Sequence, residues 1–191
     1  MDAHAEPATP RNDAPRSASG LCDAGSGPGA AWLRDHLPRP MVFTNGVFDL
    51  LHAGHVACLE AARAQGASLV VGVNSDASAR HLRKGPGRPI NTAADRARVV
   101  SALAAVTAVL VFDEDKPLAL ICALRPDVYV KGGDYEIARL AEAALMQEWG
   151  GRTHIVPRLP ALSTTALVER LRRPAWRSLA PAPGHTAWIE P

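Results

Sequence analysis

Residues 43–55 of the chain are Phe43-Thr44-Asn45-Gly46-Val47-Phe48-Asp49-Leu50-Leu51-His52-Ala53-Gly54-His55. The apolar run Met41–Thr44 favours a strand, and apolar residues recur at helical spacing over Val56–Gln65. Gly46 and Gly54 allow the backbone to approach a ligand closely. These features predict a strand, a tight loop and the start of a helix, which is where α/β proteins bind phosphate groups.

Two histidines, His52 and His55, lie three residues apart at the predicted start of this helix. At that spacing both rings share one face of the first turn, where free backbone amides already favour an anion. Two imidazole donors there would stabilise charge on a phosphate during transfer. The alternatives are a structural role for each ring and a zinc site. H-x-x-H supplies only two ligands and Cys58 adds no regular spacing, so no metal site is predicted.

Residues 45–55 resemble the G-x-F-D-x-x-H-x-G-H motif of the cytidylyltransferase-like nucleotidyltransferases. The resemblance implies an enzyme that transfers a nucleoside monophosphate from a nucleoside triphosphate to a phosphorylated acceptor and releases pyrophosphate. It implies catalytic roles for His52 and His55 at the α- and β-phosphates. It also implies Mg²⁺, held mainly by substrate oxygens and water. The resemblance extends over residues 40–172.

A basic loop follows the second predicted strand, with four cations and two glycines in residues 80–91. Its pattern Lys84-Gly85-x-Gly87-Arg88-Pro89-x-Asn91, followed by Asp95-Arg96, resembles the branch of the family that adenylylates heptose 1-phosphates. We therefore expect Lys84 to act in catalysis and Arg88 and Arg96 to contact substrate. The alternatives are a solvated charged face for the loop and an exposed helix position for Arg96.

A second motif of this branch is Pro126-Asp127-Val128-x-Val130-Lys131-Gly132-Gly133-Asp134-Tyr135, which contains a predicted strand and the residues just past it. Lys131, Gly132 and Asp134 are expected to bind the nucleotide. Paired glycines let a base or ribose lie against the backbone, and the two charged side chains offer opposite signs. By itself, K-G-G-D is a common turn.

Three hydroxyls, Ser163, Thr164 and Thr165, precede an apolar-periodic helix. Ser163 or Thr164 is expected to cap this helix. The hydroxyls and free amides of the same turn would bind nucleotide phosphates. The segment resembles the family's S-[ST]-T-x-x-x-x-R element. The choice of its arginine stays open among Arg170, Arg172 and Arg173.

The remaining candidates lie at or just beyond the ends of predicted strands. Those assigned to the nucleotide are Thr44, Asn45, Gly46, Phe48 and Gly54. Asp49, Asn74 and Asp76 are assigned to substrate binding, because polar residues at carboxyl ends of strands face the ligand crevice. Asp76 is equally well explained as a helix cap. The acidic triplet 113–115 is expected to cap the helix that begins at Lys116-Pro117 rather than to bind a metal.

Strands and helices alternate along the chain. The predicted strands are residues 41–44, 67–73, 106–112, 127–130 and 153–156. The predicted helices between and after them are residues 56–65, 77–82, 93–104, 118–124, 137–149 and 163–171. This alternation predicts an α/β fold, a single Rossmann-like, doubly wound domain with five parallel strands in the order 3-2-1-4-5. The two histidines, Lys131 and the start of the last helix would then converge at the carboxyl end of the central strand.

The two ends of the chain differ in composition from this domain. Residues 1–30 are more than half Ala, Pro, Gly and Ser, so we expect residues 1–38 to form a flexible N-terminal extension. A helical turn or two at 30–37 would place Trp32, Leu33 and Leu37 on one packing face. The nucleotidyltransferase domain is predicted at residues 39–173, beginning near Arg39, and a C-terminal tail at 174–191.

Composition limits the partners. The 191 residues are 47% hydrophobic with a formal net charge of +2, which gives no sign of a nucleic-acid surface. No apolar run is long enough to cross a membrane, and residues 1–30 lack a secretory signal. Three scattered cysteines fit a reducing compartment. We expect a cytoplasmic enzyme with small-molecule partners, no nucleic acid and no membrane, and the resemblance implies a homodimer.

The two heptose-branch motifs imply transfer of AMP from ATP to D-glycero-D-manno-heptose 1-phosphate, giving ADP-heptose for lipopolysaccharide core. Members of this branch often carry a fused sugar kinase, and this chain resembles the stand-alone form. One rival is a cytidylyltransferase acting on glycerol 3-phosphate or ethanolamine phosphate, which would share H-x-G-H and prefer CTP. The other is a nucleotide-binding module without catalysis.

Overall fold

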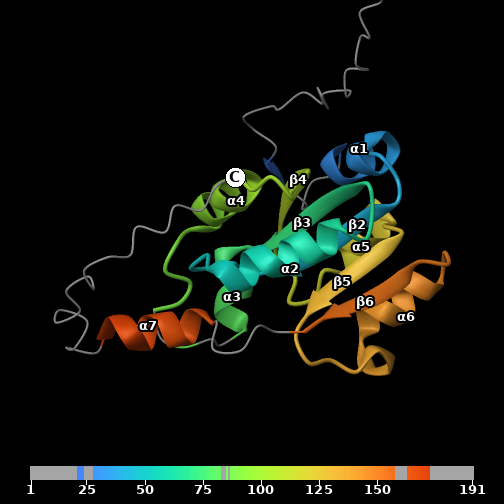
Figure 1. Ribbon diagram of the computed structural model, residues 1–191. Helices are drawn as coiled ribbons and strands as arrows, with labels where there is room; N and C mark the ends of the chain where they lie inside the picture. The colour runs from blue at the N-terminus through green and yellow to red at the C-terminus, as the bar shows by residue number, and fades with distance from the viewer. Residues whose placement is uncertain (1–20, 24–27, 83–84, 86, 158–162, 173–191) are drawn as a thin grey trace, which may run out of the picture.

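The structure is a computed structural model that describes residues 21–23, 28–82, 85, 87–157 and 163–172 (Figure 1). A six-stranded parallel sheet forms its centre. The strands are β1 (Leu21–Asp23), β2 (Met41–Gly46), β3 (Ser68–Asn74), β4 (Ala108–Phe112), β5 (Val128–Gly132) and β6 (Arg152–Val156). The helices are α1 (Pro28–His36), α2 (Ala53–Arg63), α3 (Asp76–His81), α4 (Ala93–Ser101), α5 (Leu118–Leu124), the 3₁₀ turn η2 (Ile137–Arg139), α6 (Ala141–Gln147) and α7 (Thr164–Arg172).

Five of these strands confirm the predicted fold. The sheet order is β1-β4-β3-β2-β5-β6, whose last five members reproduce the predicted order with β2 in the middle. From β2 the chain builds outward to β3 and β4 on one side, then to β5 and β6 on the other. The carboxyl end of β2 therefore lies where the connections diverge, the usual place for a ligand in such sheets.

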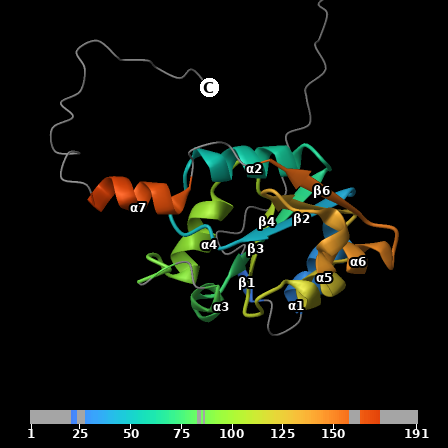
Figure 2. The ribbon, with the colours of Figure 1, turned by 90° about the horizontal axis from the view of Figure 1, so that it is seen from below.

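Helices cover both faces of the sheet, and successive side chains of each strand face opposite ways. In β3, Val71 and Val73 pack in the core under α2 and α4, whereas Val70 packs in the core under α1, α5 and α6. This alternation has the period of two expected for a strand. Figure 2 shows α2 on one side of the sheet and α1 and α5 on the other. A strand buried on both faces explains the continuous apolar run of β3.

The segment before β2 belongs to the folded body, which corrects the prediction that the domain begins near Arg39. Strand β1 pairs with β4 as a sixth strand. In α1, Ala30 and Leu33 are only 6% and 5% exposed and join the core beside α5. Trp32, predicted on the packing face, is 54% exposed and stacks on His36. The composition of this segment gave no sign of these contacts, because the few alanine and leucine residues that pack are placed among glycines and prolines.

The helices depart from the prediction in several details. Helices α2 and α4, predicted to end at residues 65 and 104, end earlier, at Arg63 and Ser101. The predicted helix 137–149 is broken at Leu140, whose extended backbone ends η2 and begins α6. Pro117 occupies the N-cap position of α5, and no side-chain hydrogen bond caps this helix, so the acidic triplet does not cap it. No helix in the described ranges is long and apolar enough to cross a membrane.

Candidate active site

A cavity of about 510 Å³ opens at the carboxyl ends of β2, β3 and β5, beside the first turns of α2 and α7. Its volume falls within the range of about 300–1,000 Å³ typical of small-molecule sites. The predicted residues that line it are Thr44, Asn45, Gly46, Phe48, Asp49, His52, Gly54, His55, Asn74, Arg88, Lys131, Gly132, Ser163, Thr164 and Thr165. Segments far apart in the sequence thus meet as the strand order predicted.

His52 and His55 lie side by side on the cavity wall. Their ring centroids are 3.8 Å apart with an interplanar angle of 23°. The backbone of His52 begins α2, and its side chain makes no capping hydrogen bond. Its Nδ1 is buried without a hydrogen-bond partner among the described residues, which is unusual for a protein interior. Burial lowers the pKa of His52 below its ordinary value, so the ring is neutral near pH 7.

The loop between β2 and α2 is held in a strained conformation. Phe48 has a φ of 50°, in the left-handed region that residues other than glycine rarely adopt. Phe48 is 8% exposed, and its ring packs against that of His55 at a centroid distance of 5.3 Å. Gly46 makes room for this ring, because a Cβ there would lie 3.0 Å from Phe48 Cε2. Packing of Phe48 therefore fixes the path of the loop that leads to the histidines.

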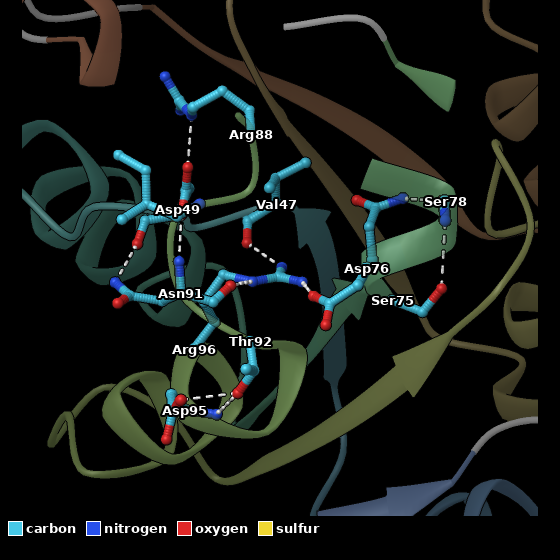
Figure 3. A network of polar contacts seen from close by, with 12 residues as sticks. Val47, Asp49, Ser75, Asp76, Ser78, Arg88, Asn91, Thr92, Asp95 and Arg96 are labelled. Carbon is cyan, nitrogen blue, oxygen red and sulfur yellow. Dashed lines mark hydrogen bonds and ion pairs between the residues drawn. The ribbon is translucent and has the colours of Figure 1, made fainter. Parts of the chain in front are cut away.

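Arg96 of α4 braces the same loop from beneath and is 1% exposed (Figure 3). Its guanidinium donates to the carbonyls of Val47 and Asn91 and pairs with Asp76 at 2.8 Å. These partners are all internal, so the predicted contact of Arg96 with substrate is not supported. Asp76 is not the cap of α3 either, because Ser75 caps that helix. In the sequence, Arg96 is one charged residue of a short predicted helix, and nothing in that pattern indicates that its side chain is buried.

Asp49 anchors the end of the basic loop (Figure 3). Its carboxylate pairs with Arg88 Nε and accepts from the backbone amides of Ile90 and Asn91 at 2.7 and 3.0 Å. The amide side chain of Asn91 donates in turn to the Asp49 carbonyl. Asp49 was assigned to substrate binding from the sequence, but these contacts within the protein engage both of its carboxylate oxygens. Asp49 instead holds Arg88 at the cavity.

Lys131 brings a positive charge to the end of β5. Its Nζ pairs with Glu142 of α6 at 3.1 Å and donates to the Tyr129 hydroxyl at 3.0 Å. That hydroxyl donates to Asn45 Oδ1 at 2.8 Å. Sequence reasoning missed Tyr129 and Glu142, because one looks like a core aromatic of a strand and the other like a surface residue of an amphipathic helix.

Gly132 forms a close contact with the helix that carries the histidines. A Cβ at this position would lie 2.8 Å from Cys58 Sγ, closer than such atoms approach in proteins. Cys58 is half-buried, and burial raises the pKa of its thiol, which stays protonated near pH 7. The glycine thus lets β5 and α2 approach at the cavity. The lining residues that the sequence assignments did not include are Val47, Cys58, Leu82, Asp115, Tyr135 and Pro157.

The first turn of α7 completes the cavity. Ser163 Oγ accepts from the backbone amide of Ala166 at 3.1 Å, which confirms the predicted cap. Thr164 and Thr165 line the cavity beside it. The described arginines of α7, Arg170 and Arg172, are exposed and do not line the cavity, and Arg173 lies outside the described residues.

Four predicted residues are not placed at the cavity. Arg96 and Asp76 lie beneath the β2–α2 loop, and Asp134 is exposed and does not line the cavity. Lys84 lies outside the residues that the structure describes, so its catalytic role stays a prediction.

The described lining is rich in hydrogen-bond donors. Arg88 and Lys131 are cationic, the histidines are potential donors, and the first amides of α2 and α7 carry positive partial charge. Within the described part of the chain, no cluster of three His, Cys, Asp or Glu side chains is placed to hold a metal ion. The arrangement suits a polyanionic ligand and the stabilisation of negative charge that moves during a transfer reaction.

Donors gathered at the switch point of a doubly wound sheet are typical of α/β proteins that bind nucleotides. Comparison with known families makes this class specific. The family model described as cytidylyltransferase-like matches residues 43–170, and the chain belongs to that family. The resemblance drawn from residues 45–55 is confirmed. The protein is accordingly a nucleotidyltransferase by family.

Two curated relatives show the similarity in more detail. The chain is 53% identical over 144 residues to D-beta-D-heptose 1-phosphate adenylyltransferase of Bordetella bronchiseptica, across 75% of this chain and 89% of the relative. It is 59% identical over 130 residues to the Bifunctional protein HldE of Streptomyces coelicolor, across 68% of this chain. The second match covers 28% of HldE, so this chain corresponds to one part of that protein.

Solved structures support the same fold. A lipopolysaccharide core biosynthesis protein from Thermoplasma volcanium matches with a TM-score of 0.53 and 29% identity, over 62% of this chain and 95% of that one. A pantoate-beta-alanine ligase from Francisella tularensis matches with a TM-score of 0.51 over 78% of this chain and 72% of that one. At 12% identity the second match concerns the fold alone.

Proposed function

We propose that the protein transfers AMP from ATP to a heptose 1-phosphate, D-glycero-D-manno-heptose 1-phosphate in our assignment, with release of pyrophosphate. The observation that carries this proposal is the stacked pair of His52 and His55 in a donor-rich cavity at the carboxyl end of β2. The 53% identity to a relative named for this activity supports the choice of nucleotide and acceptor.

The reaction needs no nucleophile from the protein. An oxygen of the acceptor phosphate forms the new bond to the α-phosphorus of ATP, and the bond from that phosphorus to the bridging oxygen breaks as pyrophosphate leaves. The electron pair of the broken bond goes to pyrophosphate. The protein's task is to align the two phosphates and to stabilise the charge that shifts toward the leaving group. His52 and His55 are assigned to that charge.

The remaining residues divide into two groups around the histidines. Lys131, Gly132 and the first turn of α7 hold the nucleotide, together with the end of β2. Arg88, held at the cavity by its ion pair with Asp49, faces the acceptor phosphate. Its guanidinium forms a charge-assisted hydrogen bond with that phosphate. Lys84 is proposed to join them from the same basic loop.

Four accompanying expectations complete the proposal. Magnesium enters as part of the substrate, bound to the triphosphate, with ligands mainly from phosphate oxygens and water. The partners are small molecules, and the enzyme acts in the cytoplasm. The homodimer that the resemblance implies stays a prediction.

The test is a grid of substrates with pyrophosphate release as the readout. ATP, CTP and GTP are each paired with both anomers of heptose 1-phosphate and with glycerol 3-phosphate. We expect pyrophosphate with ATP and one heptose 1-phosphate anomer, and ADP-heptose as the second product. Preference for CTP with glycerol 3-phosphate would favour the cytidylyltransferase instead. No turnover in any combination, with ATP still bound, would favour a binding module.

A further inference from the structure

A chain of polar contacts runs from α6 through β5 to β2 beneath the cavity. Glu142 of α6 is 3% exposed and pairs with Lys131 Nζ at 3.1 Å. Lys131 donates to the hydroxyl of Tyr129, which is fully buried, at 3.0 Å. Tyr129 reaches Asn45 Oδ1 at 2.8 Å, and Asn45 lines the cavity. Residues of α6, β5 and β2 thus form one series of contacts that includes two side chains of the site, Lys131 and Asn45.

The chemistry of the groups and the distances between them together assign the direction of each hydrogen bond in this series of contacts. An ammonium group can only donate, so the oxygen of Tyr129 accepts from Lys131. The single hydrogen of Tyr129 then goes to Asn45 Oδ1, since the alternative acceptor, Glu142 Oε1, lies farther away at 3.5 Å. With its oxygen occupied, Asn45 has its two amide N–H groups left to donate.

The ionisation states of these residues maintain this arrangement of hydrogen bonds. Burial, then the charge of Glu142, raise the pKa of Tyr129 far above its ordinary value, so the hydroxyl keeps its hydrogen. Burial alone would raise the pKa of Glu142, but a backbone hydrogen bond and the charge of Lys131 outweigh it and leave the carboxyl ionised. Lys116 adds a further favourable charge. The Lys131 ammonium also lies 5.6 Å from the centroid of the Tyr135 ring.

We propose that Glu142 and Tyr129 are positioning residues, which act through Lys131 and Asn45 to hold an ammonium and an amide donor toward the triphosphate. This inference rests on the proposed function, because it takes ATP as the ligand of the cavity. Neither residue touches the substrate. Their effect is to fix the direction of donors that otherwise rotate freely, so that a bound phosphate meets them already aligned.

Four single variants and one double variant test this. Glu142→Gln removes the charge and keeps the shape, Tyr129→Phe removes one hydroxyl, and Lys131→Met removes the ammonium. The matched control is Glu136→Gln, which breaks the exposed pair of Glu136 with Arg139 at 2.7 Å in the neighbouring turn. The double variant joins Glu142→Gln to Lys131→Met. The readouts are the Kd of a non-hydrolysable ATP analogue by equilibrium dialysis, KM for ATP and for the acceptor, kcat and Tm.

We expect Glu142→Gln and Tyr129→Phe each to raise the Kd of the analogue and the KM for ATP about tenfold, the usual scale for a lost buried hydrogen bond. The KM for the acceptor should stay unchanged, and the control should match the wild type. Because Glu142 acts through Lys131, adding Glu142→Gln to Lys131→Met should weaken binding by no more than about twofold further. Additive effects in the double variant would overturn the inference.

A purely structural role gives a different result. Lower Tm values with an unchanged Kd for the analogue and an unchanged KM for ATP would overturn the inference. If Glu142→Gln does not fold, Tyr129→Phe decides, since it preserves the volume of the core side chain. A wild-type chain that binds no ATP analogue would overturn the proposed function and this inference with it. Equal binding by wild type and both variants would overturn the inference alone.

Discussion

At the scale of single residues, the two stacked imidazoles share one small volume. Their ring centroids lie 3.8 Å apart. Burial lowers the pKa of His52, so this ring is neutral near pH 7. A neutral imidazole can donate a directed hydrogen bond to a phosphate oxygen.

Loss of one ring should lower turnover with the fold intact. We expect His55→Ala to reduce kcat about 100- to 1,000-fold, the effect of removing one oriented donor to a developing charge. The measurement is pyrophosphate release with ATP and heptose 1-phosphate. His36→Ala, an exposed histidine of α1 away from the cavity, is the control and should keep full activity. Normal turnover by His55→Ala would remove the histidine from its assigned role.

His52 should also make the stability of the protein depend on pH. In the unfolded chain this histidine takes up a proton near its ordinary pKa of about 6.5, whereas burial delays protonation in the folded chain to lower pH. The unfolded state therefore binds more protons in the window just below pH 6.5 or so, and the free energy of unfolding falls as the pH falls through it.

The comparison is with His52→Gln, which lacks this titration. Urea unfolding at a series of pH values should show a steeper loss of stability for the wild type than for the variant as the pH falls from about 7 to about 5. Parallel curves would contradict the assigned direction of the pKa shift.

Some residue assignments followed from local pattern and others needed three dimensions. His52, His55 and Ser163 were placed correctly because glycine, strand end and helix start lie within a few residues of them. Arg96 was not, because burial of its guanidinium depends on the carbonyl of Val47, which is 49 residues away. Glu142 was missed for the same reason.

At the scale of elements, α4 supports the loop that carries the histidines. Replacing Arg96 by methionine leaves the carbonyls of Val47 and Asn91 without their donor and Asp76 without its partner. We expect Arg96→Met to lower the free energy of unfolding by about 3 kcal/mol or more. Arg98→Met, on the exposed face of the same helix, should change it by less than about 0.5 kcal/mol. Chemical denaturation of both variants is the measurement, and equal stabilities would show that Arg96 is dispensable.

Strand order was predictable at this scale because each buried strand is a short apolar run between helices. Capping was predictable where a hydroxyl precedes the helix, as Ser163 does for α7 with a hydrogen bond from the backbone amide of Ala166. The prediction that the acidic triplet 113–115 caps α5 was wrong. Acidic residues are generally favoured near the start of a helix, but that preference does not require a specific capping hydrogen bond. One of the three, Asp115, lines the cavity instead.

At the scale of the whole molecule, α1 is a structural part that lies away from the chemistry. It leads into the amino end of β2, whereas the cavity lies at the carboxyl end. Leu33→Ala should therefore cost about 2–5 kcal/mol of stability and leave kcat at 25 °C unchanged. Trp32→Ala, at a position 54% exposed, should cost much less. Thermal unfolding and pyrophosphate release check both, and a loss of kcat in folded Leu33→Ala would contradict this separation.

The short strand β1 has a consequence for how the chain behaves outside its native fold. By pairing with β4, it occupies the backbone hydrogen-bonding groups of an apolar strand that would otherwise be the edge strand of the sheet. A chain shortened to begin at Arg39 would expose β4 as an edge strand, and unpaired apolar edge strands pair with strands of other molecules. Such a shortened chain is expected to aggregate during production, although every residue of its cavity is still present.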